Sequence, residues 1–100
     1  MNYILAIDSG ATKSEVLLYP ITDDPRFGAK TGLYMYPFIN LNLLGFDESV
    51  KRLKKIVKDM AKVAGKGNIL AIAAGISGAR YEKDRKKIAS ALKKASGVKN

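Results

Sequence analysis

The chain has 100 residues, of which 47% are hydrophobic and 27% charged, a composition typical of a folded globular domain and not of a disordered one. It contains no cysteine and no histidine, which excludes disulfides, thiolate metal sites and histidine-based catalysis. The net charge is +9, and because no apolar stretch approaches the roughly twenty residues that span a membrane, we expect a cytoplasmic protein with no membrane partner.

The first two expected elements are strands joined by a turn. Tyr3 to Ile7 is almost wholly apolar, as in a buried strand, and Glu15 to Tyr19 is a second apolar run that Pro20 is expected to stop. Both runs are too short for helices. The segment between them is polar or small, so the pattern predicts a hairpin whose turn runs from Ser9 to Ser14.

A third strand and a helix follow. The polar segment "TDDPRFGAKTG" is expected to be a turn, Gly32 to Phe38 a strand, and Asn40 to Gly45 a loop. Asp47 then resembles a helix N-cap, and Gly65 and Gly67 end the helix. Its apolar positions recur every three or four residues: Val50, Leu53, Ile56 or Val57, Met60 and Ala64.

The last two expected elements are a strand and a helix. Asn68 to Gly78 is a continuous apolar run closed by small residues, which favours a strand covered on both faces and therefore paired in parallel. A helix is expected from about Glu82 to Ala95, with Ile88, Ala89 and Leu92 facing inward and Gly97 ending it. The predicted class is an α/β fold: three antiparallel strands, then a helix, a parallel strand and a helix.

Positive charge is concentrated in the second half of the chain. Between residues 51 and 94 there are fourteen basic residues and three acidic ones. A nucleic-acid-binding surface is one explanation. Solvated helix faces are the other, and we favour them because eleven of the fourteen are lysines at helical spacing opposite an apolar stripe. Nucleic acid is therefore not the expected partner.

The turn "DSGATKS" has a composition suited to phosphate. Small residues let backbone amides approach an anion, Thr12 and Ser14 add hydroxyl donors, and Lys13 adds a compact cation. Asp8, at the end of the preceding strand, can hold Mg²⁺ through water. The dinucleotide fingerprint and the Walker loop are excluded because both pass from a strand into a helix. The alternative interpretation is an ordinary hairpin with a polar tip.

The stretch "IDSGATKSEVLLYP" resembles the first phosphate motif of the actin-like and sugar-kinase-like ATPases. It is most similar to the N-acetylglucosamine kinase family, which also includes the activator ATPases of benzoyl-CoA reductase. "NLNLLGFDESVKRLKKIV" resembles the family's Asn-containing loop and first helix, and "AAGISGARYEKDRKKIASALKK" its strand, Ser-Gly turn and second helix. The resemblance covers essentially all of the chain and implies a ribonuclease-H-like lobe of the actin-like ATPase type.

The resemblance also implies roles for single residues. Asp8 would position Mg²⁺ and water near the γ-phosphate of ATP. Asn40 matches a position near the sugar pocket, and Ser77 and Gly78 match a small turn facing the interdomain cleft. Phosphate oxygens would be contacted by the whole turn, which comprises Ser9, Gly10, Ala11, Thr12, Lys13 and Ser14. The family often has glycine where this chain has Ser9 and Ala11.

The family's second phosphate loop, its general base and its C-terminal lobe have no counterpart in these residues. Residues 1–100 are therefore expected to be the N-terminal part of the first lobe of a two-lobed protein, inactive alone. The intact protein is expected to transfer a phosphoryl group from ATP to N-acetylglucosamine or a related amino sugar. An activator-type ATPase coupled to a partner enzyme and a basic nucleic-acid-binding module are the alternatives. A homodimer is compatible with the apolar strand left at a sheet edge.

Overall fold

Alternating burial along the first two strands defines the two faces of the sheet. The computed structural model describes residues 2–10, 12–21, 32–65, 67–78 and 82–96. In β1 (Asn2–Ser9) the side chains of Leu5, Ile7 and Ser9 are buried, and those between them are less so. In β2 (Lys13–Ile21) the buried positions are Ser14, Val16 and Leu18, which stand opposite them in the register. One face of the hairpin is therefore the core face.

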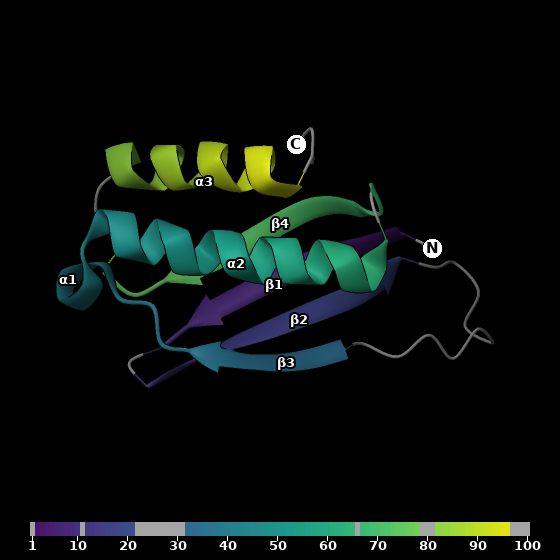
Figure 1. Ribbon diagram of the computed structural model, residues 1–100, viewed down its shortest axis with the longest axis horizontal. Helices are drawn as coiled ribbons and strands as arrows, with labels where there is room; N and C mark the ends of the chain where they lie inside the picture. Colours follow the sequence, from purple (N-terminus) through teal and green to yellow (C-terminus); the bar gives the residue numbers. More distant parts are fainter. Residues whose placement is uncertain (1, 11, 22–31, 66, 79–81, 97–100) are drawn as a thin grey trace.

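The remaining elements build a mixed sheet with helices on one side. They are β3 (Gly32–Pro37), α1 (Leu41–Leu44), α2 (Phe46–Ala64), β4 (Ile69–Ile76) and α3 (Glu82–Ser96). β2 pairs antiparallel with β1 and with β3, while β4 pairs parallel with β1. In Figure 1, α2 and α3 lie side by side over the same face of this sheet. The structure thus confirms the α/β class, the antiparallel hairpin and the parallel fourth strand.

The order of the elements differs from the prediction in two ways. Across the sheet the order is β3-β2-β1-β4, so the fourth strand lies beside the first strand and not in chain order after the third. Along the chain, the segment predicted as a loop at Asn40 to Gly45 contains the short helix α1. Asn40 is its N-cap, accepting a hydrogen bond from the Asn42 amide at 2.8 Å.

Three smaller predictions are also wrong. β2 continues through Pro20 to Ile21, and Pro20 stands opposite Tyr3 near the end of the ladder. Gly45, not Asp47, is the N-cap of α2, and Asp47 lies in its first turn. β4 is not covered on both faces, because Ala73 and Gly75 are exposed on the side away from the helices. The expectations for Ala11, for residues 22–31 and for the helix end at Gly97 lie outside the described residues.

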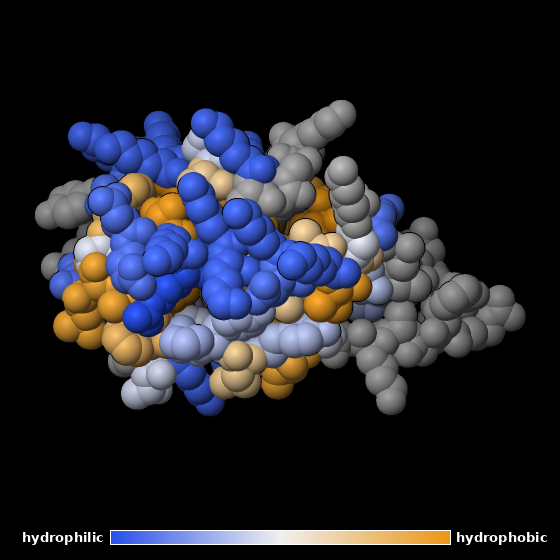
Figure 2. Space-filling view, viewed as in Figure 1, coloured by the Kyte–Doolittle hydropathy of each residue, from blue (hydrophilic) through white to orange (hydrophobic). Residues whose placement is uncertain are grey.

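The core lies between the sheet and α2, with α3 along one side. Val16 and Leu53 have no exposed surface. All of the apolar positions predicted for α2 are buried or partly buried, and Ile88 and Leu92 of α3 are buried. The lysines of α2 point the other way, and Figure 2 shows a hydrophilic surface over α2 and α3. Both helices were predicted from this 3.6-residue period, which places apolar and charged residues on opposite faces.

A hydrogen bond between two side chains connects β3 to α2. The Tyr36 hydroxyl donates to Asp59 Oδ2 at 2.9 Å, and Lys55 Nζ lies 3.2 Å from the same oxygen. Burial, followed by this hydrogen bond, raises the pKa of Tyr36 to about 12. The same hydrogen bond, followed by Lys55, lowers the pKa of Asp59. Protonated Tyr36 and ionised Asp59 therefore stabilise the folded state together.

We expect stability to fall as pH rises from about 10 to about 12, because the folded state keeps the Tyr36 proton over this range while the unfolded state loses it. Chemical denaturation at several pH values measures this slope. In Asp59→Asn the Tyr36 pKa should fall toward that of an ordinary tyrosine and the slope should shrink. A Tyr36 pKa that is unchanged in Asp59→Asn would show that the hydrogen bond has no effect on it.

Candidate functional site

Asp8 lies at the carboxyl end of β1 on the face away from the helices. Its side chain is exposed, and it stands in register with Glu15 of β2 on one side and Gly75 of β4 on the other. A Cβ at Gly75 would lie 3.9 Å from Asp8 Oδ1, so the backbone of β4 leaves room beside the carboxylate. The shallow depression there has a volume of about 440 Å³ and is lined by Ala6, Ile7, Asp8, Glu15, Leu17, Ala73, Ala74 and Gly75.

The turn after Asp8 is tighter than predicted. Its ends are Ser9 and Lys13, since β2 already begins at Lys13. The Gly10 amide donates to the Lys13 carbonyl at 2.9 Å, so this amide is already paired within the turn. Thr12 and Lys13 are exposed at the tip. The Lys13 ammonium lies 3.5 Å from Glu15 Oε1, with about half of each side chain exposed, so this ion pair is weak and easily exchanged.

Ser9 and Ser14 do not contribute their hydroxyls to the turn. Both side chains face the core, with 4% and 0% of their surface exposed. Ser9 Oγ donates to the Ile39 carbonyl and accepts from the Ile39 amide at 3.0 Å. Ser14 Oγ donates to the Pro37 carbonyl at 3.0 Å and lies 3.2 Å from Ser9 Oγ. The hydroxyl donor expected from Ser14 is therefore already bonded inside the protein, as is the Ser9 hydroxyl.

Three segments distant in sequence meet at this end of the sheet. Ser77 Oγ donates to the Ser9 carbonyl at 2.8 Å. Asn40 and Ser77 form an isolated parallel bridge, and the Leu41 amide donates to the Ser77 carbonyl at 3.0 Å. Asn40, Ser77 and the β1–β2 turn are thus brought together beyond the carboxyl ends of two parallel strands, where open α/β sheets commonly bind ligands.

Gly78 lies where the Asn40 segment meets the turn after β4. It has φ of +86°, and a Cβ there would lie 3.1 Å from Asn40 Oδ1 and from the amide nitrogens of Leu41 and Asn42. A side chain at this position would be strained by the backbone conformation and would also clash with the start of α1. The sequence predicted Asn40 and Gly78 as substrate-facing residues; in the structure Asn40 caps α1, and Gly78 packs against that cap.

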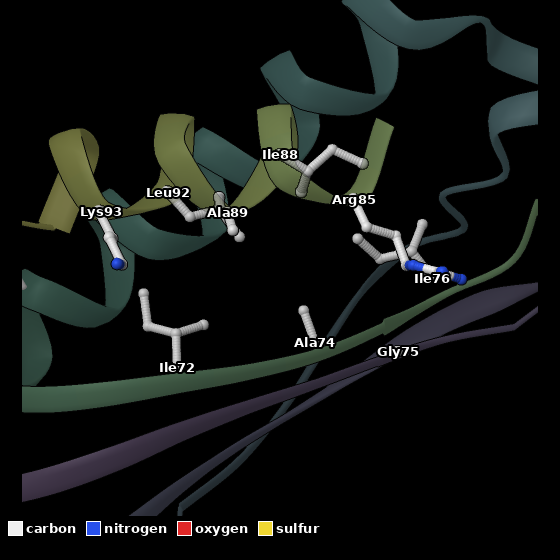
Figure 3. Close-up of a pocket in the computed structure, with 9 residues that line it drawn as sticks. All are labelled: Ile72, Ala74, Gly75, Ile76, Arg85, Ile88, Ala89, Leu92 and Lys93. Atoms are coloured by element: carbon white, nitrogen blue, oxygen red, sulfur yellow. The ribbon is translucent and has the colours of Figure 1, made fainter. Parts of the chain in front are cut away.

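A larger cavity lies elsewhere, between β4 and α3 (Figure 3). Its volume is about 490 Å³, and Ile72, Ala74, Ile76, Ile88, Ala89 and Leu92 give it an apolar lining, with Arg85 and Lys93 at its rims. Because it lies on the helix side of β4, it is separate from the Asp8 carboxylate on the opposite face. Sequence analysis placed Ala89 inward but gave no sign of a cavity.

In the described part of the chain, Asp8 does not belong to a larger cluster of carboxylates. Within the described ranges, no group of three or more His, Cys, Asp or Glu side chains could hold a metal ion together. Glu15 is the nearest acid in the strand register and was not singled out from the sequence, although its place follows from the pairing of Ser9 with Ser14. In the part of the chain that the structure describes, no helix is long and apolar enough to cross a membrane.

Comparison with known proteins does not assign the chain to a family: no family model matches the sequence, and no curated protein matches it. Any functional assignment therefore depends on the motif and on the geometry described above.

The close packing around Gly78 can be tested by one substitution and two control substitutions. We expect Gly78→Ala to lower the free energy of unfolding by about 1–3 kcal/mol, since it adds both backbone strain and a clash. Gly45→Ala, with φ of +80° and open space around it, should show the strain alone, about 1 kcal/mol. Gly75→Ala should change stability by less than about 0.5 kcal/mol. Urea denaturation measures all three, and equal losses for Gly78→Ala and Gly75→Ala would contradict the packing described.

Proposed function

We propose that the chain is the phosphate-binding part of an ATP-dependent phosphotransferase, in the first lobe of a ribonuclease-H-like, actin-like ATPase. The acceptor proposed is a sugar, N-acetylglucosamine or a related amino sugar. The observation that carries the proposal is the position of Asp8, an exposed carboxylate at the carboxyl end of a central strand, directly before a tight turn with an exposed threonine and lysine.

The proposed lobe is supported by the way the chain passes through the sheet. An antiparallel hairpin begins it, and the first strand of that hairpin also pairs in parallel with β4, the strand that follows α2. The Asn40 segment and the Ser77–Gly78 turn reach the same end of the sheet as Asp8. These are the three segments in which the sequence resembles the N-acetylglucosamine kinase family.

The residues present fit a hydrated magnesium ion. Mg²⁺ keeps most of its waters and is held by one or two carboxylates together with substrate phosphates, and Asp8 is one exposed carboxylate with space beside Gly75. When bound, Mg²⁺ neutralises charge on the phosphates of ATP. Lys13 supplies a cation and Thr12 a hydroxyl to the phosphates, while Ser9 and Ser14 hold the turn from beneath. The Glu15 carboxylate lies 3.5 Å from the Lys13 ammonium, an exposed contact that phosphate oxygens would replace.

Two other functions compete with sugar phosphorylation. An activator-type ATPase would use the same Asp8 site and couple it to a partner enzyme. A nucleic-acid-binding module would use the exposed face of α2, where one helix displays Lys51, Lys54, Lys55, Lys58 and Lys62. Binding of generic duplex DNA that weakens steeply with salt would support that module. We favour the phosphate site because α2 buries its apolar stripe, which accounts for lysines on the opposite side.

The first test uses this chain with ATP and Mn²⁺, a paramagnetic substitute for Mg²⁺. Because only one phosphate loop is present, we expect weak binding, with a dissociation constant of roughly 1 mM or above. Line broadening in NMR spectra should centre on Asp8, Thr12 and Lys13, and Asp8→Asn should remove it. Broadening centred on the lysines of α2, or none at roughly 20 mM ATP, would contradict the proposed site.

The second test concerns turnover in a two-lobed protein that contains this sequence. Asp8→Asn should lower kcat for amino-sugar phosphorylation about a hundredfold or more, because it removes the carboxylate that organises the cation. The KM for the sugar should change little. Glu15→Gln is the matched control, since it removes a neighbouring exposed carboxylate from the same face, and it should retain activity within about threefold. An Asp8→Asn enzyme with activity that close to wild type would overturn the assignment.

A further inference from the structure

The face of the sheet away from the helices is an exposed apolar surface. We call it the open face; its apolar side chains are Ile4, Ala6, Leu17, Tyr19, Ile21, Leu33 and Met35, with Ala71 and Ala73 of β4 beside them. Leu33 is 61% exposed, Met35 51% and Ile21 44%. Soluble monomers rarely expose a contiguous apolar patch of more than a few hundred Å² without a binding role.

The open face is large enough for a specific interface. Four strands about 4.8 Å apart and averaging about eight residues at about 3.3 Å per residue give roughly 500 Å² of flat area per copy. Two copies joined by this face would bury roughly 1,000 Å² or more, the lower limit for a specific interface. The area alone predicts a weak dimer, not an obligate one.

The distribution of charge is compatible with a second copy as the partner. Among the described residues, the charged side chains of the open face are Asp8, Glu15 and Lys13, and they sum to −1. The chain carries +9, and lysines gather on the far side over α2 and α3 (Figure 2). Two copies joined by their open faces therefore keep their lysine-rich helices on opposite outer surfaces. This arrangement keeps the two sets of lysines far apart and so reduces the repulsion between the two positively charged chains.

The edge of β4 is a second apolar surface, but pairing through it would not keep the lysine-rich helices apart. β4 is an edge strand without a charged residue, which makes it a candidate for strand pairing between copies. However, α3 lies next to β4 across the cavity in Figure 3 and has Lys86, Lys87, Lys93 and Lys94. Pairing two β4 edges would bring two such helices together and would be opposed by their like charge.

We propose that the open face is a self-association surface, through which two copies of this chain pack sheet against sheet. Such sheets lie about 10 Å apart with strands inclined by roughly 30°, and a two-fold axis would run between them. The centre of the face is the register pair Ala6–Leu17, midway along both central strands. Whichever way the axis runs between the sheets, it passes near Leu17, so Leu17 should contact Leu17 of the second copy. The proposal does not depend on the proposed function. Because Leu17 also lines the depression beside Asp8, a dimer and a ligand in that depression would exclude one another.

Sedimentation equilibrium of the 100-residue chain tests the surface. We expect a monomer–dimer equilibrium with a dissociation constant of roughly 10–500 µM. Leu17→Lys and Met35→Lys should each weaken it at least about tenfold by placing like charges in the contact. Met35 is half exposed and at the edge, so its variant keeps the test valid where Leu17→Lys fails to fold, which circular dichroism would show. The matched control is Leu43→Lys, on α1 and 70% exposed, which should dimerise like wild type.

Disulfide cross-linking tests where the two-fold axis lies. The chain has no cysteine, so a disulfide between two copies of a single-cysteine variant shows that the substituted position lies next to its own counterpart. Leu17→Cys should form a disulfide-linked dimer on mild oxidation, and Leu43→Cys should not. A monomer at roughly 1 mM would overturn the proposal. So would a dimer indifferent to both lysine variants, which would indicate pairing through another surface such as the β4 edge.

Discussion

Ser9 connects three segments at the carboxyl end of β1 through its hydroxyl and its backbone carbonyl. The hydroxyl donates to the Ile39 carbonyl and accepts from the Ile39 amide, as a neighbouring strand would. The Ser9 carbonyl in turn accepts from Ser77 Oγ. One residue at the end of β1 thus fixes the chain before α1 and the turn after β4. Ile39 has no exposed surface, and leaving its amide unpaired would cost about 1–3 kcal/mol.

The face of the sheet on which the Ser9 side chain lies also determines the face on which the Asp8 side chain lies. Successive side chains of a strand point to opposite faces, so burying Ser9 in the core puts Asp8 on the open face. There it has Glu15 and Gly75 as its strand neighbours. In the proposed site the buried serines would therefore be positioning residues, and the side chains that could reach a ligand would be those of Asp8, Thr12 and Lys13. The same alternation leaves Leu17 and Tyr19 on the open face, which connects the proposed phosphate site and the proposed dimer contact to one property of β1 and β2.

Local patterns predicted most of the fold. The hairpin, β3, α2 and α3 follow from apolar periodicity and from glycines, and these signals lie within single segments. The helix α1 was missed because it has four residues, too few for a periodic pattern. β4 was expected to be covered on both faces because a continuous apolar run does not show whether anything packs on its second side.

The candidate site could be predicted in part. Asp8 and the turn were identified from composition, and the core-facing position of Ser9 was available from the sequence, since it continues the alternation of Leu5 and Ile7. The hydrogen-bond partner of Ser9 could not be predicted. Ile39 is thirty positions away in the sequence, and the contact depends on the path of the chain from β3 to α1. The convergence of Asn40 with Ser77 has the same cause. Asparagine is a common helix N-cap, but nothing in the sequence distinguishes that role at Asn40 from contact with a substrate.

Amide hydrogen exchange at Ile39 tests the central role of Ser9 most directly. In the wild-type chain the Ile39 amide should exchange as slowly as the core amides of β1, because it is buried and bonded to Ser9 Oγ. In Ser9→Ala its exchange should accelerate at least about tenfold relative to those core amides, with that of the Leu41 amide accelerating as well. Thr12→Ala, at the exposed tip of the same turn, should leave both rates unchanged. An Ile39 amide that exchanges freely in wild type, or one equally protected in Ser9→Ala, would contradict the account.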